Sequence, residues 1–157
     1  MDIADEEFIK ILSAFNENKV IFMLVGGFAV NYYGYNRTTA DFDLWVKPTK
    51  ENQEKIAKSM ISTGFTHEEL TDFLLEDYTQ PLTFQIGGST FYIDVMNFIT
   101  GISFDEAYKT AINDLISSKY PIKIIHRNHL ILNKVLTGRT KDKSDVEMLQ
   151  RIEQKKL

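Results

Sequence analysis

Three aspartates interrupt apolar segments of the sequence, in a pattern that could do chemistry. Asp41 and Asp43 stand two residues apart in the segment 41–46, whose alternation of side chains suits a strand. Both carboxylates of such a strand project from one face, close enough to share a hard cation. Asp94 interrupts the otherwise apolar or aromatic segment 91–96, where a lone carboxylate is costly to bury unless it is paired or metal-bound. If the two strands are neighbours, the three carboxylates could hold one or two Mg²⁺ ions for phosphoryl or nucleotidyl transfer.

An Asp-x-Asp motif alone is common, and the alternative is that these carboxylates cap a turn, face water or pair with a lysine. A glycine pair upstream favours the functional interpretation. Gly26 and Gly27 follow the apolar run 20–25 and precede a short helical segment. At such a junction the backbone can approach an anion closely, and N–H groups of the helix start face it. The specific feature is the order of a strand, the glycine pair, a short helix and then Asp-x-Asp on a second strand. The glycine pair and the Asp-x-Asp motif are separated by 13 residues, which include the short helix.

The segment VGGFAVNYYGYNRTTADFDLWV, residues 25–46, resembles the signature of the polymerase-β-like nucleotidyltransferase superfamily. Residues 37–44 are particularly similar to its minimal, AbiEii-like or otherwise uncharacterised prokaryotic branch. Residues 129–149 resemble the closing helical segment of that branch. The resemblance implies Mg²⁺-dependent transfer of an NMP from an NTP to a hydroxyl acceptor, with release of pyrophosphate. Mn²⁺ could replace Mg²⁺, and the acceptor could be a small molecule, a protein or an RNA.

The resemblance also assigns roles to individual residues. It implies that Asp41 and Asp43 bind the metal ions and that Asp94 completes the set and helps to deprotonate the acceptor. It implies that Gly26 and Gly27 contact the phosphates of the NTP. Gly27 stands where superfamily enzymes often have serine, so it supplies no hydroxyl to a phosphate.

Basic residues could balance the charge of the polyphosphate. Lys134 lies inside an apolar helical pattern and Arg139 follows at the end of that helix. A cation there would offset negative charge as pyrophosphate leaves. Arg37 could reach a phosphate or could pair with an acidic residue to set the loop. The alternative is that these cations are solvated, while Asp142 and Asp145 are expected to be partners of the basic turn or helix-start residues.

A second interpretation makes the chain a binding module, one component of a toxin–antitoxin pair that contacts a small helical partner or RNA. Residues 119–157 hold 10 basic and 4 acidic side chains, against 8 and 18 in residues 1–118. RNA binding through this basic tail would weaken steeply with salt. The acidic triad favours an enzyme, because a module without a metal would gain nothing from three clustered carboxylates.

His126 and His129 stand three residues apart and could share one helix face. No third ligand lies near them in the sequence, as a zinc site would require. We therefore expect both to be simple hydrogen-bonding residues.

The elements that must position these residues predict an α/β (α+β) fold, a mixed sheet flanked by helices with a helical C-terminal segment. The resemblance implies that this sheet is of the minimal nucleotidyltransferase type. Residues 1–157 are interpreted as a single domain, with a core of about residues 5–126 and closing helices over about 127–153. The expected helices cover residues 5–18, 28–33, 49–62, 103–112, 128–136 and 142–152, and the expected strands 20–25, 41–46, 82–86, 90–96 and 121–125. Gly87-Gly88 predicts a hairpin.

Composition excludes several other classes of protein. The 157 residues include no cysteine, which excludes disulfides, thiolate metal sites and a cysteine nucleophile. The longest apolar run has 11 residues, against about 20 for a membrane helix. The acidic N-terminus lacks the features of a signal peptide. We therefore expect a cytoplasmic protein without a membrane partner, and its net charge of −4 argues against a generally basic nucleic-acid coat.

Overall fold

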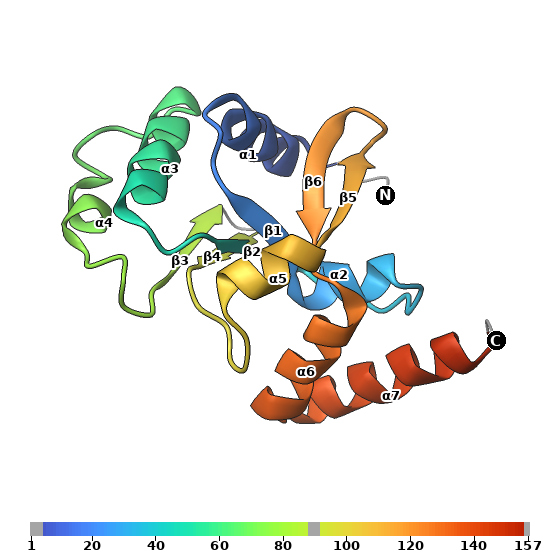
Figure 1. The fold of residues 1–157 in the computed structure, drawn as a ribbon. Coiled ribbons are helices and arrows are strands. Elements are labelled where there is room, and N and C mark those ends of the chain that lie inside the picture. The colour runs from blue at the N-terminus through green and yellow to red at the C-terminus, as the bar shows by residue number, and fades with distance from the viewer. Residues whose placement is uncertain (1–4, 88–91, 156–157) are drawn as a thin grey trace.

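A six-stranded mixed sheet crosses the protein, with helices on both of its faces (Figure 1). The computed structural model describes residues 5–87 and 92–155. The strands are β1 (Phe22–Val25), β2 (Asp41–Val46), β3 (Thr83–Gly87), β4 (Tyr92–Met96), β5 (Ile112–Ile116) and β6 (Tyr120–Ile124). The helices are α1 (Glu6–Glu17), α2 (Gly26–Tyr32), α3 (Lys50–Ser62), α4 (Thr71–Leu75), α5 (Phe104–Thr110), α6 (Arg127–Thr137) and α7 (Thr140–Gln154).

The sheet order β3-β4-β2-β1-β6-β5 mixes parallel and antiparallel pairs. β2 runs parallel to β4, and β1 runs parallel to β6. The pairs β1–β2, β3–β4 and β5–β6 are antiparallel. The expected mixed α/β sheet is therefore confirmed.

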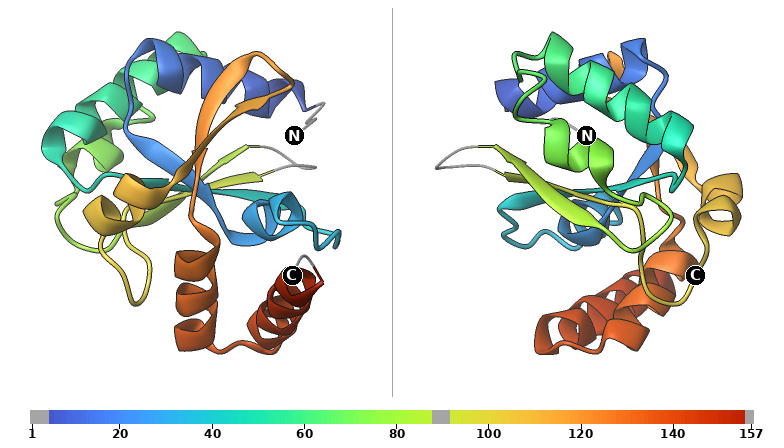
Figure 2. Two further views of the ribbon diagram at one scale, coloured as in Figure 1. Left: turned by 45° about the vertical axis from the view of Figure 1, so that its right-hand side comes forward. Right: turned by 90° about the vertical axis from the view of Figure 1, so that its left-hand side faces the viewer.

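The buried face of the sheet packs on α1 and α3 (Figure 2). Phe42 is central to this packing. Its ring is stacked between the rings of Phe8 in α1 and Phe28 in α2, with centroid distances of 3.8 Å in both pairs. Since side chains alternate along a strand, the burial of Phe42 on this face turns Asp41 and Asp43 to the opposite face.

The two C-terminal helices lie on the other side of the sheet from α1 and α3 (Figure 2). α6 ends at Gly138, whose φ of +64° closes the helix in the left-handed conformation. α7 begins directly after Arg139 and packs beside α6. The chain thus places its basic segment opposite the polar face of β2.

The sequence-based prediction of the helix over 103–112 was wrong at its C-terminal end. Its start is capped, since the Ser103 hydroxyl accepts a hydrogen bond from the Glu106 amide. However, α5 ends at Thr110, and residues 112–116 form the edge strand β5. The strand was missed because it is short and mostly exposed, so its apolar side chains do not alternate clearly.

The remaining predicted elements differ from the structure by at most two residues at their ends. The one difference that matters for function is at α2, which begins at Gly26 instead of Phe28, so that the glycine pair forms the first turn of the helix. The predicted hairpin is confirmed by the antiparallel pairing of β3 with β4. Its turn at Gly88, and the first two residues of the predicted strand 90–96, lie outside the described residues. Among the helices in the described ranges, none has the length and apolar character that crossing a membrane requires.

Replacement of Phe42 by alanine tests the core packing. The substitution removes a ring that is 2% exposed and stacked on both sides, so we expect it to lower the free energy of unfolding by about 3–5 kcal/mol. Urea denaturation followed by circular dichroism measures the change. Leu75→Ala on α4, where the side chain is 79% exposed, is the matched control and should stay within about 0.5 kcal/mol of the unsubstituted protein. A loss below about 1 kcal/mol for Phe42→Ala would contradict this packing.

Candidate active site

The parallel pairing of β2 with β4 brings the three aspartates onto one face of the sheet. Asp43 is paired in register with Asp94, and Asp41 lies opposite Tyr92. All three carboxylates are partly exposed, whereas the intervening Phe42 and Ile93 are buried on the other face. A site shared by the three aspartates requires their two strands to be neighbours, and β2 and β4 are neighbours in the sheet.

These carboxylates line a cleft of about 720 Å³ between the polar face of the sheet, the start of α2 and the α6–α7 pair. All eight candidate site residues from the sequence contribute to its lining: Gly26, Gly27, Arg37, Asp41, Asp43, Asp94, Lys134 and Arg139. Sequence reasoning missed other residues in the lining, among them Thr39, Met96, Phe98, Asn133 and Thr137. For Met96 a signal exists, since it lies two residues after Asp94 on the same strand face.

The carboxylate of Asp43 lies directly against the backbone of Gly26. Gly26 has a φ of +62°, and a Cβ atom at this position would lie 1.9 Å from Oδ2 of Asp43. The next amide, that of Gly27, donates a hydrogen bond of 3.3 Å to the same oxygen. Glycine at position 26 is therefore needed both for the backbone conformation and for the close approach of the carboxylate.

Gly27 allows a second close approach, that of the loop before β2. A Cβ atom on Gly27 would lie 2.4 Å from the Thr39 hydroxyl oxygen and 3.1 Å from Nη2 of Arg37. Because no side chain stands there, Arg37 and Thr39 reach the first turn of α2 and join the cleft lining.

The charge on Asp43 is unfavourable in its present surroundings. Burial raises the pKa of Asp43 to about 6, the amide of Gly27 opposes this rise, and the charges of Asp94 and Asp41 add to it. Lys134 lowers the pKa again, though with a smaller effect. A cation close to these carboxylates would relieve both the burial and the repulsion.

Asp94 is hydrogen-bonded to the edge strand β3. Its Oδ1 atom accepts a hydrogen bond of 2.7 Å from the Gln85 side-chain amide. Over residues 5–87 and 92–155, no three Asp, Glu, His or Cys side chains are grouped closely enough to hold a metal ion together. The aspartates thus share a face and a cleft, but their oxygens are not gathered around one point.

Two buried carboxylates organise the cations on the opposite wall of the cleft. Asp145 pairs with Arg37 at 2.8 Å and with Lys134 at 2.7 Å. Asp142 pairs with Lys134 at 3.2 Å and with Arg139 at 2.7 Å. Both carboxylate side chains are 1% exposed, so this ion network is largely desolvated. The expectation that Asp142 and Asp145 are partners of the basic residues is confirmed.

This network rules out the alternative that Lys134 is a solvated cation. Its side chain is 5% exposed and contacts two carboxylates, so its charge is already neutralised within the protein. Burial would raise the pKa of Asp142, but hydrogen bonds from Arg139, Thr137 and Lys134 hold it well below its ordinary value. With three cations around two carboxylates, the network keeps one positive charge, and its most exposed cation is Arg139, at 74%.

The two histidines are hydrogen-bonding residues, as expected. Nδ1 of His126 accepts a hydrogen bond from the Asn128 amide and so caps α6. Nδ1 of His129 lies 3.2 Å from the hydroxyl of Thr110 at the end of α5. Neither histidine lines the cleft.

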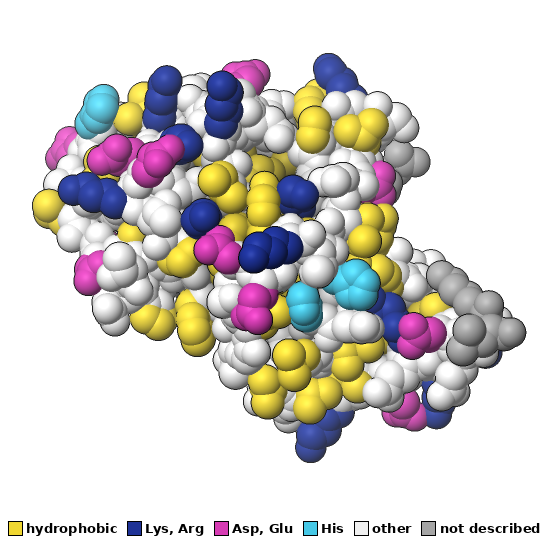
Figure 3. Space-filling model, viewed as in Figure 1, with side chains coloured by type: hydrophobic (Ala, Val, Ile, Leu, Met, Phe, Trp, Pro, Cys, Tyr) yellow, Lys and Arg dark blue, Asp and Glu magenta, His cyan; other side chains and the backbone are white. Residues whose placement is uncertain are grey.

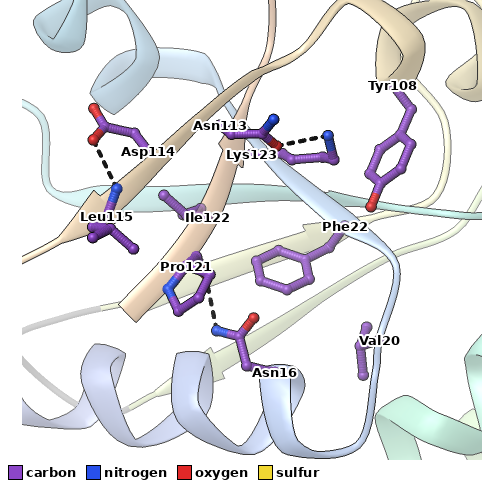
Figure 4. Close-up of a pocket in the computed structure, with 10 residues that line it drawn as sticks. All are labelled: Asn16, Val20, Phe22, Tyr108, Asn113, Asp114, Leu115, Pro121, Ile122 and Lys123. Atoms are coloured by element: carbon purple, nitrogen blue, oxygen red, sulfur yellow. Dashed lines mark hydrogen bonds between the residues drawn. The ribbon is translucent and has the colours of Figure 1, made fainter. Parts of the chain in front are cut away.

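A second cavity, of about 370 Å³, is a hollow between α1, β6 and α5 (Figures 3 and 4). Its floor is apolar, formed by Phe22 and Ile122 among others. Its lysine, Lys123, donates to the side chain of Asn113 and lies over the ring of Tyr108. The cavity lacks the paired carboxylates and glycines of the first cleft, which is therefore the candidate active site.

Comparison with known proteins agrees with the fold. The model of a family described as "Nucleotidyl transferase of unknown function (DUF2204)" matches residues 4–157. The chain belongs to this family. The fold also matches the crystal structure of the lincosamide antibiotic adenylyltransferase LnuA with lincomycin bound, with a TM-score of 0.54 and 14% sequence identity over 97% of this chain and 99% of that one. None of the curated proteins matches the sequence.

The family match confirms the resemblance to the polymerase-β-like nucleotidyltransferase superfamily. The structural match supports the fold alone, since so low a sequence identity does not carry over a substrate. The closer resemblance to the AbiEii-like branch stays a prediction. The roles assigned to the individual residues of the cleft also stay predictions.

The raised pKa of Asp43 predicts a pH-dependent stability of the metal-free protein. The folded state binds this proton more tightly than the unfolded state, whose pKa is near 3.8, so the contribution of Asp43 to the free energy of unfolding should fall as pH rises from about 4 to about 6. Asp43→Asn removes this loss, and we expect the variant to be more stable than the unsubstituted protein by about 1–3 kcal/mol at pH 8. Urea denaturation in a chelator at pH 4 and pH 8 measures it. A difference between variant and unsubstituted protein that does not change with pH would contradict the prediction.

Asp145→Asn tests the ion network. The variant leaves Arg37 and Lys134 without their shared buried carboxylate, so we expect a loss of about 3–5 kcal/mol in the free energy of unfolding. Thermal and urea denaturation measure it. Glu153→Gln, which breaks an ion pair whose carboxylate is 58% exposed, is the control and should cost at most about 1 kcal/mol. Equal losses in the two variants would show that the network is not desolvated.

Proposed function

We propose that this nucleotidyl transferase is Mg²⁺-dependent and moves an NMP from an NTP to a hydroxyl acceptor, releasing pyrophosphate. The observation that carries the proposal is the cleft itself. Carboxylates from two adjacent parallel strands face a glycine pair and a buried ion network with an excess of positive charge. Phosphoryl and nucleotidyl transfer need these three features together, because catalysis depends on positioning and on balancing the phosphate charge.

The residues on the sheet fit a divalent metal by their chemistry. Asp41, Asp43 and Asp94 supply only carboxylate oxygens, the donors that Mg²⁺ prefers, and the chain has no cysteine that could bind a softer metal. The raised pKa of Asp43 also favours a cation, since burial and repulsion both disfavour its bare charge. When bound, Mg²⁺ or Mn²⁺ would supply charge neutralisation at the phosphates. Asp94 would have to turn from Gln85 to share the ion.

The start of α2 and the cations of the cleft support binding of the polyphosphate. Gly26 and Gly27 line the cleft beside these cations, and their lack of side chains lets Asp43, Thr39 and Arg37 lie against the start of α2. Arg139 is the most exposed cation of the network, and Arg37 and Lys134 stand behind it, held by Asp145. We assign the leaving pyrophosphate to this side, where the network's excess positive charge would offset the developing negative charge.

Asp94 is the candidate general base. In the proposed reaction the acceptor oxygen attacks the α-phosphorus, and the bond from this phosphorus to the bridging oxygen of the β-phosphate breaks. The proton of the acceptor hydroxyl passes to a carboxylate oxygen of Asp94. In the structure one oxygen of Asp94 accepts from Gln85, so the turn that would bring Asp94 to the ion would also free this oxygen.

The structurally similar protein is named as an adenylyltransferase that was solved with a small antibiotic bound. This supports ATP as the first nucleotide to test and a small molecule as the first class of acceptor. The alternative is a toxin–antitoxin component that contacts a partner protein or RNA through the basic C-terminal helices. The same experiment tests this alternative.

The experiment is incubation of the protein with each α-labelled NTP, with Mg²⁺ or Mn²⁺, and with a cell lysate. Separation by size shows whether the label enters small molecules, protein or RNA. Transfer that requires the divalent cation supports the proposal. Absence of transfer from every NTP, together with retention of an unlabelled partner protein or RNA, would support the binding module instead.

Asp43→Asn is the decisive variant for catalysis. The amide removes a metal-binding charge but keeps the shape of the side chain, so we expect NMP transfer to fall by at least about 100-fold while the fold is retained. The label transfer assay measures the activity, and circular dichroism checks the fold. Asp72→Asn, a matched change at an exposed position on α4, should leave transfer unchanged. Full activity of Asp43→Asn would rule out the mechanism.

A further inference from the structure

One wall of the cleft is apolar and uncharged, and it continues β4 beyond Asp94. Met96 lies on the same strand face as Asp94, two residues further on, and Phe98 and Ile99 follow it along the cleft. Phe98 is 56% exposed although it is one of the largest apolar side chains. An exposed aromatic ring in the lining of a cleft is a contact surface for a ligand more than a part of the core.

The backbone that presents Phe98 is firmly held. The neighbouring Asn97 is 3% exposed, and its side-chain amide donates to the carbonyl groups of Tyr78 and Gln80, at 2.7 and 2.9 Å. Its side-chain oxygen accepts from the amide of Leu82 at 2.7 Å. On the other side of Phe98, Ile99 is 7% exposed and belongs to the core. The chain therefore fixes both neighbours of Phe98 and leaves the ring outside.

The same segment is also attached to α6. The side-chain amide of Asn133 donates to the carbonyl of Thr100 at 3.0 Å. Both residues line the cleft, so the apolar wall is fixed at its two ends, by Asn97 and by Thr100. A wall fixed in this way can discriminate between ligands by shape, because it need not be ordered when a ligand binds.

Charge is distributed unequally around the cleft. The basic residues of its lining come from the loop before β2 and from the α6–α7 pair, namely Arg37, Lys134, Arg139 and Lys141. Residues 92–103 carry no basic side chain, and Asp94 is their single charged residue. A polyphosphate is thus favoured on the α6–α7 side, while an anionic group on the β4 side would face Asp94 without a cation from its own wall.

We propose that Met96 and Phe98 form the acceptor subsite, and that the acceptor is an uncharged small molecule that packs an aromatic or aliphatic group on Phe98 while presenting a hydroxyl to Asp94. The inference rests on the proposed nucleotidyl transfer and names the class of its acceptor. Phe98 is a specificity-determining residue in this scheme: it contacts the body of the acceptor and takes no part in the chemical step. A nucleic acid fits this wall poorly, because its backbone phosphates would find no cation along it.

The test compares two probes that share their hydroxyls and differ in one apolar group, methyl β-D-glucopyranoside and phenyl β-D-glucopyranoside. Their binding to the protein with Mg²⁺ and a non-hydrolysable ATP analogue is measured by ligand-observed NMR titration. We expect the phenyl glucoside to bind roughly 10-fold more tightly or better, because a matching apolar contact in a pocket gives discrimination of this size. A short RNA with a free 3′-hydroxyl is the third probe and should bind more weakly than the phenyl glucoside.

Phe98→Ala should abolish the preference for the phenyl glucoside, and Phe98→Leu should keep part of it. Leu75→Ala, a change at an exposed apolar position on α4, is the matched control and should keep the full preference. Equal binding of the two glucosides to the unsubstituted protein, an undiminished preference in Phe98→Ala, or tighter binding of the RNA would each overturn the inference.

Binding of the ATP analogue separates this inference from the proposed function. It is titrated alone with each variant and should be unchanged in Phe98→Ala, because Phe98 is uncharged and is not among the residues assigned to the phosphates. If the unsubstituted protein does not bind the analogue with Mg²⁺, the proposed nucleotidyl transfer fails. If it binds the analogue but shows no preference between the glucosides, only the acceptor subsite fails.

Discussion

The parallel pairing of β2 with β4 is the constraint on which the rest of the structure depends. Parallel strands need a crossover connection, and here α3, α4 and β3 fill the chain between them. The pairing brings Asp43 and Asp94 level with each other although they are far apart in the sequence. Phe42 fixes which face they occupy, because its ring is stacked between α1 and α2 on the opposite side. A shift of one residue would bury the carboxylates.

Carboxylates placed together in this way raise an electrostatic cost that the fold does not fully remove. Gly27 donates one hydrogen bond to Asp43, and Gln85 donates one to Asp94. Lys134 lowers the pKa of Asp43, but its ammonium group is paired with Asp142 and Asp145. The cleft therefore keeps two regions of opposite charge that neutralise each other only in part. A divalent cation with a polyphosphate is the kind of ligand that would complement both regions.

The sequence predicted more of the sheet than of the cleft. Asp-x-Asp on a strand, the glycine pair and the mixed sheet follow from local patterns, because alternation and turn residues act over a few positions. The burial of Lys134 between two carboxylates was harder to predict, since Asp145 lies on the other side of the Gly138 turn and its burial depends on how α6 meets α7. The outward position of Phe98 could not be predicted either, because it follows from hydrogen bonds between Asn97 and the distant residues Tyr78 and Gln80.

The cleft is divided between helices and strands in a way that would let this fold change its acceptor. The residues assigned to phosphate lie in α2 and in the network around Asp145, while the apolar wall lies on β4 and the segment after it. Since Met96 and Phe98 share no ion pair with that network, substitutions there can alter the surface offered to an acceptor without disturbing the cations. The backbone of the wall is fixed by Asn97, so its shape is kept while its side chains vary. β4 and the segment after it thus carry both the candidate base and a surface that can vary independently, which allows chemistry and acceptor choice to be separated within a few residues.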